Sequence, residues 1–373
     1  FSCSFAMWAT FVHLRDLVEF RTSSPSVHRM YSFCKGITSR VHPMSVIDGG
    51  SLPTATPREI VTKPRRSDQI FRFVVTTGGL SSLIILGLIF AFLAYRGVGV
   101  LRAEGFGFIT NSNWDVIEDE NSNIISQSYG LAAMLVGTIL SATVSIIIGV
   151  PIAVLSALFL EFYAGRKIRS ILVALIDLMA AFPSILFGLW GFLVLMPSAE
   201  YWAKLLNKYL GWIPLFDVPA PVFTRSPFIA GVVLAIMIIP ITTSISREVF
   251  SQTPLDRIQA AYALGATRLS MIRAVVIPFG RGGIVGGAML GLGRAMGETV
   301  AVYTVLNVVY QVNWQVLFGA GGNVASLILL KFGEAGPYEV DALMAAGLIL
   351  FLLTLMVNAI ADVLINRFGG KGR

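Results

Sequence analysis

Six long apolar segments constrain this sequence more than any other feature. They cover about residues 71–95, 129–160, 170–196, 227–246, 282–309 and 342–365. A helix needs about 20 apolar residues to cross the hydrocarbon core of a membrane, and each segment reaches that length. Only 13% of the 373 residues are charged, against about 25% in soluble domains, so these segments are not the core of a soluble protein. The sequence therefore predicts an all-α polytopic membrane protein with six transmembrane helices.

The distribution of Lys and Arg predicts how these helices are oriented. If the N-terminus is cytoplasmic, fifteen of the basic residues from Lys63 onward fall in inner segments and six in outer segments. Cytoplasmic loops carry the excess of positive charge, so both termini are expected in the cytoplasm. The formal net charge of +7 then belongs to these loops. Because no basic stripe with interleaved aromatic residues lies elsewhere, the expected surrounding is membrane lipid and no nucleic-acid partner is expected.

The N-terminal region differs from the rest of the chain. Both cysteines and all three histidines precede Met44, so neither a disulfide framework nor a His/Cys metal site is expected in the membrane domain. We interpret residues 1–43 as an upstream extension before a functional start at Met44; a genuine disordered tail is the alternative. Residues 44–69, rich in Pro, Thr, Ser and charge, are predicted to form a flexible cytoplasmic arm. The transmembrane domain then covers 70–368, and 369–373 form a cytoplasmic tail.

The loop between the fourth and fifth segments carries an informative short motif. About residues 250–280 contain the run IQAAYALGATRLSMIRAVVIPFGRGG. Gly265 suits a C-terminal cap, so one short helix is predicted over 254–264 and a second, over about 267–277, is predicted to end at Pro278. Such an element is too short to span a membrane. An ordinary amphipathic cytoplasmic loop is the simpler interpretation.

The spacing within this run resembles the EAA loop of ABC importer permeases, which reads Glu-Ala-Ala, three residues, Gly, nine residues, Ile, one residue, Leu-Pro. The corresponding positions are Gln259, Ala260, Ala261, Gly265 and Pro278, with Gln in place of Glu. The resemblance implies that the loop docks into a cleft of a separate ATPase subunit. The chain has no Gly-x-x-x-x-Gly-Lys-Ser/Thr run to cradle a phosphate, so ATP and Mg²⁺ are expected on that partner. We therefore expect a transport subunit with no cofactor and no catalytic residues of its own.

The fifth segment combines close-packing glycines with two charged residues. At about 100° per residue, one helix face about 80° wide holds Gly283, Gly287, Gly291, Arg294 and Glu298. Glycines at this spacing admit a neighbouring helix closely. A charge at the membrane centre costs at least about 2.5–3.5 kcal/mol, so Arg294 is expected to face a cavity or a partner. Two interpretations stay open: an Arg294–Glu298 ion pair locks the helix, or Arg294 lines a path and contacts an anion while Glu298 holds it.

Three longer runs sharpen the assignment. The runs LGLGRAMGETVAV, IMIIPITTSISREVFSQTP and AAFPSILFGLWGF resemble the PstC-type permeases of bacterial phosphate importers, and the likeness extends over nearly all of residues 65–368. The resemblance implies a six-helix permease of the MetI-like ABC importer fold in the bacterial plasma membrane. The implied partners are a second permease of PstA type, two ATPase subunits of PstB type and an extracytoplasmic phosphate-binding protein of PstS type. In that family an intramembrane Arg and Glu are tied to phosphate passage; they correspond to Arg294 and Glu298, and Thr299 follows them.

Two further features concern the third helix and the outer loops. Pro183 and Ser184 are predicted to break the third helix, which frees backbone groups that can line the path. Trp114, Trp202 and Trp212 lie in the long outer loops and are interpreted as anchors at the membrane edge, where Trp is enriched. Stacking on a ligand is the alternative.

Other functions remain open from the residues alone. A permease of the same fold for sulfate or molybdate would also need a cation in its path, and Arg294 cannot separate these anions from phosphate. A secondary transporter driven by an ion gradient would have no need of the EAA-like loop at about residues 250–280, which we call the coupling loop. A membrane enzyme is not expected, because the chain beyond residue 43 has no His or Cys from which to build a catalytic site.

Overall fold

The computed structural model of the chain describes residues 66–118, 124–218, 222–319 and 321–368. The predictions for residues 1–43, for 44–65 of the N-terminal arm and for 369–373 lie outside the described residues. The chain divides into two units, Phe1–Gly87 and Leu88–Arg373. The first unit contributes the beginning of helix α3, and the second contains the other described elements.

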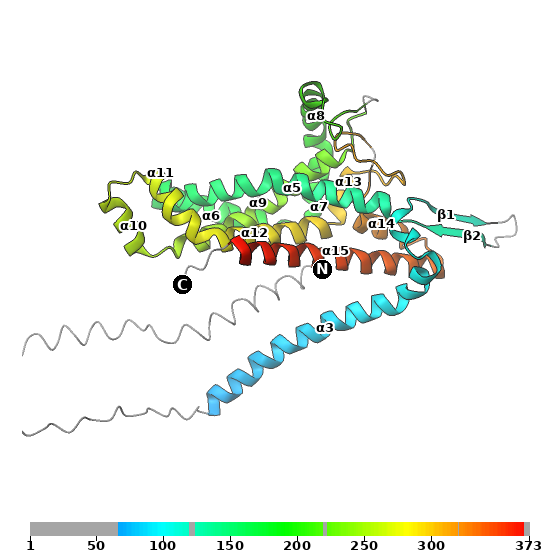
Figure 1. Ribbon diagram of the computed structural model, residues 1–373, viewed down its shortest axis with the longest axis horizontal. Coiled ribbons are helices and arrows are strands. Elements are labelled where there is room, and N and C mark those ends of the chain that lie inside the picture. Colours follow the sequence, from blue (N-terminus) through cyan, green and yellow to red (C-terminus); the bar gives the residue numbers. More distant parts are fainter. Residues whose placement is uncertain (1–65, 119–123, 219–221, 320, 369–373) are drawn as a thin grey trace, which may run out of the picture. The chain divides into compact units, whose positions relative to one another are not determined.

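The described part of the chain is mainly helical, with one small hairpin (Figure 1). The elements up to the hairpin are α3 (Arg66–Glu104), α4 (Gly107–Thr110), β1 (Trp114–Glu118) and β2 (Ile124–Tyr129). The following elements are α5 (Ala132–Leu158), α6 (Arg166–Ala181), α7 (Ser184–Trp190), α8 (Met196–Leu210), α9 (Pro227–Ser251), α10 (Leu255–Ala263), α11 (Arg268–Met271), α12 (Ile277–Gly297), α13 (Val300–Val305), α14 (Val324–Lys331) and α15 (Pro337–Phe368). Short π-helical turns extend α5 over Phe159–Tyr163, join α7 to α8 over Gly191–Leu195, and join α11 to α12 over Ile272–Val276.

Six helical stretches among the described residues are long and apolar enough to cross a membrane. They are Arg66–Glu104, Ala132–Phe162, Ser184–Leu210, Pro227–Ser251, Arg268–Gly297 and Pro337–Val363. The predicted number of transmembrane helices is therefore confirmed. The first, second, fourth and sixth stretches contain most of the residues predicted for them, whereas the third and fifth differ.

The third predicted segment, 170–196, is not one helix. The backbone of Phe182 and Pro183 is extended, with ψ angles of 138° and 134°, so α6 ends at Ala181 and a new helix begins at Ser184. A residue that precedes Pro is disfavoured in the helical region, which explains the extended backbone of Phe182. The predicted break at Pro183 is present, but the long apolar stretch begins after the break and continues to Leu210.

The fifth predicted segment, 282–309, also has different bounds. The helix starts at Arg268 and runs to Gly297, so the prediction that a short helix ends at Pro278 is wrong. A π-helical turn lies directly before Ile277, and Pro278 follows it in the first turn of α12. Because a proline is tolerated in the first turn of a helix, Pro278 does not end this one. At the other end, α12 stops because the backbone of Glu298 is extended, with a ψ angle of 125°.

The centre of the second unit is the packing of α5, α9 and α12. Small residues allow the close approach of α5 and α9: a Cβ on Gly149 would lie 2.9 Å from the Ile238 side chain, and one on Gly231 would meet Val144. The largest apolar cluster on α9 includes Ile229, Leu234 and Ile238, all buried. In Figure 1 the axes of these helices lie roughly parallel to the axis of α15, and α12 runs in the opposite chain direction to the others.

The β1–β2 hairpin lies at the end of the second unit away from α10 (Figure 1). Trp114 is 4% exposed, its ring packs edge-on against Tyr129, and its Nε1 donates a hydrogen bond to Glu339 Oε1 at 2.8 Å. The interpretation of Trp114 as a membrane-edge anchor is therefore wrong, because its ring and its donor are both used inside the protein.

Two tyrosines near Glu339 have raised pKa values. Burial, and then the negative charge of Glu339, raise the pKa of Tyr129 to about 12, and burial and the same carboxylate raise the pKa of Tyr310 to about 12.

Candidate functional site

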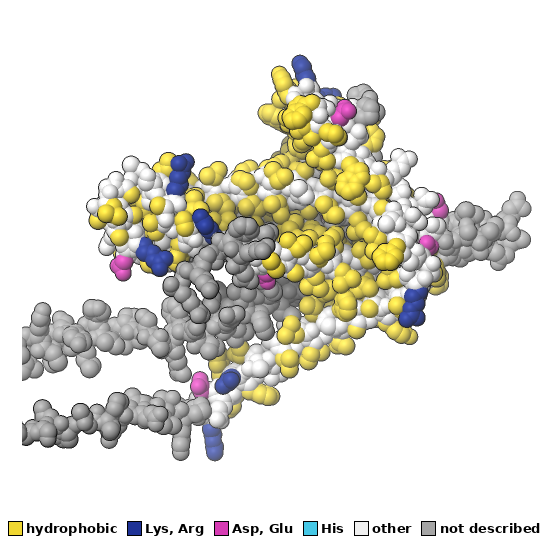
Figure 2. Space-filling view, in the orientation of Figure 1, with side chains coloured by type: hydrophobic (Ala, Val, Ile, Leu, Met, Phe, Trp, Pro, Cys, Tyr) yellow, Lys and Arg dark blue, Asp and Glu magenta, His cyan; other side chains and the backbone are white. Residues whose placement is uncertain are grey.

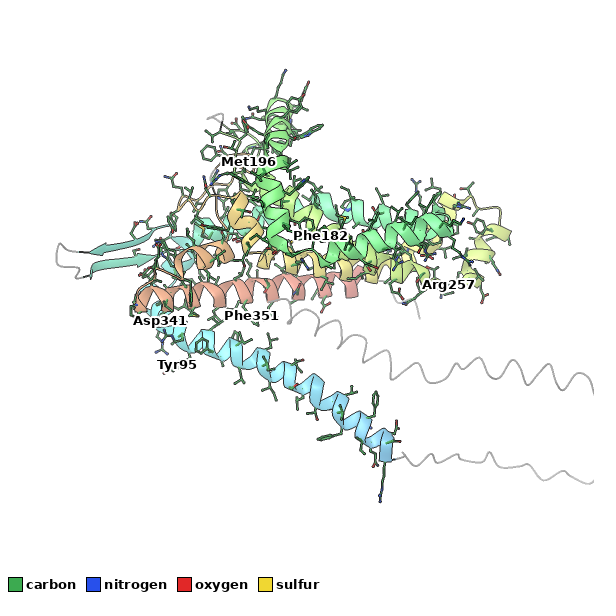
Figure 3. The ribbon with its side chains drawn as sticks, turned by 180° about the vertical axis from the view of Figure 1, so that it is seen from behind. Tyr95, Phe182, Met196, Arg257, Asp341 and Phe351 are labelled. Carbon is green, nitrogen blue, oxygen red and sulfur yellow. The ribbon has the colours of Figure 1, made fainter. Side chains whose placement is uncertain are left out.

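Two interrupted helices meet inside the second unit. One break lies at Phe182–Pro183, between α6 and α7, and the other lies at Glu298–Thr299, between α12 and α13. Figure 3 marks the first break at Phe182. The short helices that follow the breaks pack against each other, since a Cβ on Gly188 of α7 would lie 2.6 Å from the Cα of Ala301 in α13. Interrupted helices inside a membrane expose backbone groups that can line a polar path.

Arg294 lies in the last turn of α12, directly before the second break. Its side chain is partly exposed, but its Nε atom is buried and has no hydrogen-bond partner. The ion pairs found among the described residues do not include one between Arg294 and Glu298. The interpretation of these two residues as an ion-pair lock is therefore wrong, because the helix that would have aligned them ends at Gly297.

Glu298 instead holds the break itself. The residue is 9% exposed, and its Oε1 accepts a hydrogen bond from the backbone N–H of Ala301 at 3.2 Å. This contact satisfies one of the free N–H groups at the start of α13. The hydroxyl of Thr299 donates to the carbonyl of Gly297 at 3.3 Å, across the same break. Glu298 and Thr299 thus fix the backbone next to Arg294 rather than neutralise its charge.

A buried polar cluster on other segments supports this break, and sequence reasoning missed it. Asn323 donates through Nδ2 to the carbonyl of Glu298 at 2.9 Å, while its Oδ1 accepts from the N–H of Ser326 at 2.6 Å and caps α14. The N–H of Val324 donates to Thr138 Oγ1 on α5 at 3.1 Å. Asn323, Ser326 and Thr138 are each at most 1% exposed. An Asn before the apolar run VASLILL is a helix-start signal that could have marked Asn323.

The glycine stripe of α12 faces α9. Thr242 Oγ1 donates a hydrogen bond to the carbonyl of Gly287 at 3.2 Å, and a Cβ on Gly291 would lie 3.0 Å from the same Thr242 oxygen. A Cβ on Gly283 would fall among the side-chain atoms of Val249, with Cγ1 at 2.7 Å. The stripe therefore positions α12, and with it Arg294, against a helix of the same chain.

The coupling loop lies at the far end of the bundle, around α10 and α11 (Figure 1). α10 forms within the predicted range, and Gly265 adopts a φ angle of +80°, which glycine tolerates and other residues rarely adopt. Gln259 and Ala260 are exposed, Ala261 packs against the apolar cluster around Phe250 and Met271, and Pro278 is exposed at the start of α12.

Arg268 fastens this loop to the end of α5. Its Nη1 donates to the carbonyl of Phe162 at 3.1 Å, and its guanidinium lies over the ring of Tyr163, 5.3 Å from the centroid. Arg257 makes a similar contact with Phe279, at 5.9 Å. The loop therefore contacts the end of α5 and, through Phe279, the start of α12, the helix that ends at the second break. Within the described ranges, no group of three or more His, Cys, Asp or Glu side chains is placed to hold a metal ion.

Comparison with known proteins identifies the family. The model of the family described as "Binding-protein-dependent transport system inner membrane component" matches residues 149–370, which is more than half of the chain. The chain belongs to this family of binding-protein-dependent inner membrane components. The matched range contains both helix breaks, Arg294 and the coupling loop, so the geometry described above lies in the part of the chain that defines this inner membrane component.

Curated relatives of this inner membrane component agree with the resemblance to PstC-type permeases. "Phosphate transport system permease protein PstC 2" of Mycobacterium tuberculosis is 42% identical over 82% of this chain and 93% of the relative. "Phosphate transport system permease protein PstC" of Mycobacterium leprae is 41% identical over 80% of this chain and 92% of the relative. A solved structure of a bacterial alginate ABC transporter is 16% identical, with a TM-score of 0.49, over 83% of this chain and all of that one.

Proposed function

We propose that this chain is the membrane-spanning permease subunit of an ATP-driven importer of inorganic phosphate, and that it forms half of the translocation path. The observation that carries the proposal is Arg294, whose buried Nε has no partner beside a break in the fifth transmembrane helix. The names of the mycobacterial relatives support phosphate as the substrate. The chain then acts as a transport subunit, and ATP hydrolysis belongs to a partner.

Arg294 suits an oxyanion for a physical reason. Its guanidinium is planar and permanently charged, and it presents parallel N–H donors that match two oxygens of a phosphate. A charged donor inside the membrane that lacks a protein acceptor lowers its energy when an anion passes. Glu298 and Thr299 keep the backbone broken at this point. Pro183 and Ser184 break the third helix, whose following segment, α7, packs on α13; we assign all four residues to the same path.

Exposed apolar side chains on α10 and directly after it support docking of a separate ATPase subunit. Leu255, Tyr262 and Leu264 are 64%, 44% and 89% exposed, and apolar side chains of this size form contacts when a partner covers them. We assign Gln259, Ala260, Ala261, Gly265 and Pro278 to this coupling element.

The proposal includes an assembly and an orientation. The partners are a second permease of PstA type, two ATPase subunits of PstB type that carry ATP and Mg²⁺, and an extracytoplasmic binding protein of PstS type. Both termini and α10 lie in the cytoplasm, because the basic residues of the loops favour that side.

An importer of sulfate or molybdate with the same fold is the second candidate, since a guanidinium binds those anions through the same donors. The names of the relatives favour phosphate over both. A transporter driven by an ion gradient fits less well, because it gives the exposed α10 loop no role.

The test is uptake of radiolabelled phosphate in a bacterial strain that lacks this permease and is complemented with the chain. Uptake should be restored, should fall when unlabelled arsenate competes, and should resist excess sulfate. It should persist after a protonophore collapses the ion gradient while ATP is maintained, and stop when ATP is depleted. Inhibition by sulfate would contradict the substrate, and loss with the ion gradient alone would contradict the energy source.

A further inference from the structure

Helix α8 differs in direction from the helices around it. In Figures 1 and 3 it runs across α5 and α9 rather than along them, and Met196 marks its start in Figure 3. Ala203 on its inner face is fully buried in a cluster that includes Leu317 and the ring of Phe228. Because Phe228 belongs to the first turn of α9, α8 is fixed at the end of α9 opposite the coupling loop.

The length of α9 places this contact at the edge of the membrane. α9 has 25 residues, which is about 37 Å at 1.5 Å per residue, whereas the hydrocarbon core is about 30 Å thick. Both ends of α9 therefore reach the headgroup region. A helix that crosses the first turn of α9 lies in the plane of that region. In this placement the third crossing consists of α6 and α7, and α8 is the part of the apolar stretch Ser184–Leu210 that does not cross.

The residues of α8 divide into three faces, about 120° apart at 100° per residue. The first face is buried and holds Met196, Ala199 and Ala203. The second is charged and holds Glu200, Lys204 and Lys208. The third carries apolar and aromatic side chains, namely Trp202, Leu205 and Tyr209. Figure 2 shows basic, acidic and hydrophobic side chains together on this projecting part of the molecule.

The side chains on the two outward faces are accessible. Trp202 and Tyr209 are 57% and 68% exposed, and Lys208 is exposed as well. Lys204 is held by Glu200 at 2.8 Å, on the side away from the aromatic face. A helix with one charged and one aromatic flank matches the gradient across a membrane interface, where aromatic rings enter the acyl boundary and lysines reach the phosphates.

We propose that α8 is an interfacial helix whose occupant is the lipid surface itself. Trp202 and Tyr209 insert between the lipids, and Lys204 and Lys208 bind the phosphates of anionic headgroups. A protein partner fits these faces less well, because lysines are depleted in the cores of protein interfaces and here they form one whole flank of the helix beside the aromatic flank. The anchor would hold the second helix break at a fixed depth, since α8 continues from α7, which packs on α13. The inference does not depend on which anion is transported.

The test is collisional accessibility of spin labels in the assembled transporter, reconstituted in liposomes of phosphatidylethanolamine and phosphatidylglycerol. Single cysteines would replace Trp202, Tyr209, Lys204 and Lys208 in a chain whose two cysteines are removed by Cys3→Ser and Cys34→Ser. Labels at 202 and 209 should collide preferentially with oxygen, which concentrates in lipid. Labels at 204 and 208 should collide severalfold more with the water-soluble nickel complex NiEDDA. A label at Asp115 on the exposed part of β1 serves as the aqueous reference.

Two results would overturn the proposal. Low accessibility to both reagents at 202 and 209 would mean that a protein subunit covers this face. High accessibility to NiEDDA at all four positions would mean that α8 stands in water. Quenching of the chain's tryptophan fluorescence by brominated phospholipid gives a second measurement without labels: Trp202→Phe should reduce the quenched fraction, and an unchanged fraction would also contradict lipid insertion.

Discussion

The sharpest test of the proposed path is the substitution Arg294→Lys. Lysine keeps the positive charge and most of the length but removes the planar fork and the Nε donor. That Nε is buried and has no acceptor in the protein, so in our proposal its acceptor is the passing anion. A hydrogen bond to a charged group contributes about 1.5–3 kcal/mol, and 1.4 kcal/mol corresponds to about a tenfold change. The rate of phosphate uptake should therefore fall about 10- to 100-fold.

The assay compares initial uptake of radiolabelled phosphate by parent and variant at equal membrane abundance. Arg281→Lys is the matched control, because Arg281 lies on the same helix with its side chain exposed, and uptake should not change. Assembly should survive Arg294→Lys, since Glu298 is held by the N–H of Ala301 and not by Arg294. Uptake by the lysine variant close to that of the parent would show that the guanidinium makes no paired contact with the anion.

Three further predictions concern packing, the polar cluster and coupling. Gly283→Ala should lower the stability of the complex by about 1–3 kcal/mol, because the new methyl group meets Val249, whereas Gly286→Ala, which meets nothing within 4 Å, should not; equal melting temperatures of the two purified complexes would contradict the packing of α12 on α9. Asn323→Ala should cost about 0.5–2 kcal/mol from the lost cap of α14, whereas Asn323→Asp keeps the capping oxygen but buries a carboxylate that faces the Glu298 carbonyl, so it should lower both the melting temperature and uptake more than Asn323→Ala does; normal stability and uptake of Asn323→Asp would contradict the role of Asn323 at the break. Gln259→Glu should leave ATP-driven uptake near normal, because the exposed side chain keeps its size, and loss of uptake would mean that the docking surface requires a neutral group there.

The number of membrane helices and the position of the coupling loop could be read from the sequence, because both depend on local composition. An apolar run of about 20 residues is long enough to cross the membrane, and its length and composition are properties of the run alone. Pro183 and Gly265 likewise act on their own backbone, so the break in the third helix and the turn after α10 follow from those residues alone.

The break at Glu298 could not be predicted in this way. The run from Gly283 to Leu306 has no proline, and Gly297 before the break is one of several glycines in it, so nothing local singles out Glu298 as the point where the helix ends. The interruption depends on residues far away in the sequence. Asn323, which lies 25 residues further along, donates a hydrogen bond to the Glu298 carbonyl, and Thr138 of α5 accepts one from the N–H of Val324. The sequence by itself determined that Arg294 lies in the membrane near an acid. Only the tertiary structure decided that the acid caps a helix and leaves the Arg294 Nε without a partner, because contacts between distant segments outweigh the propensity of the segment itself.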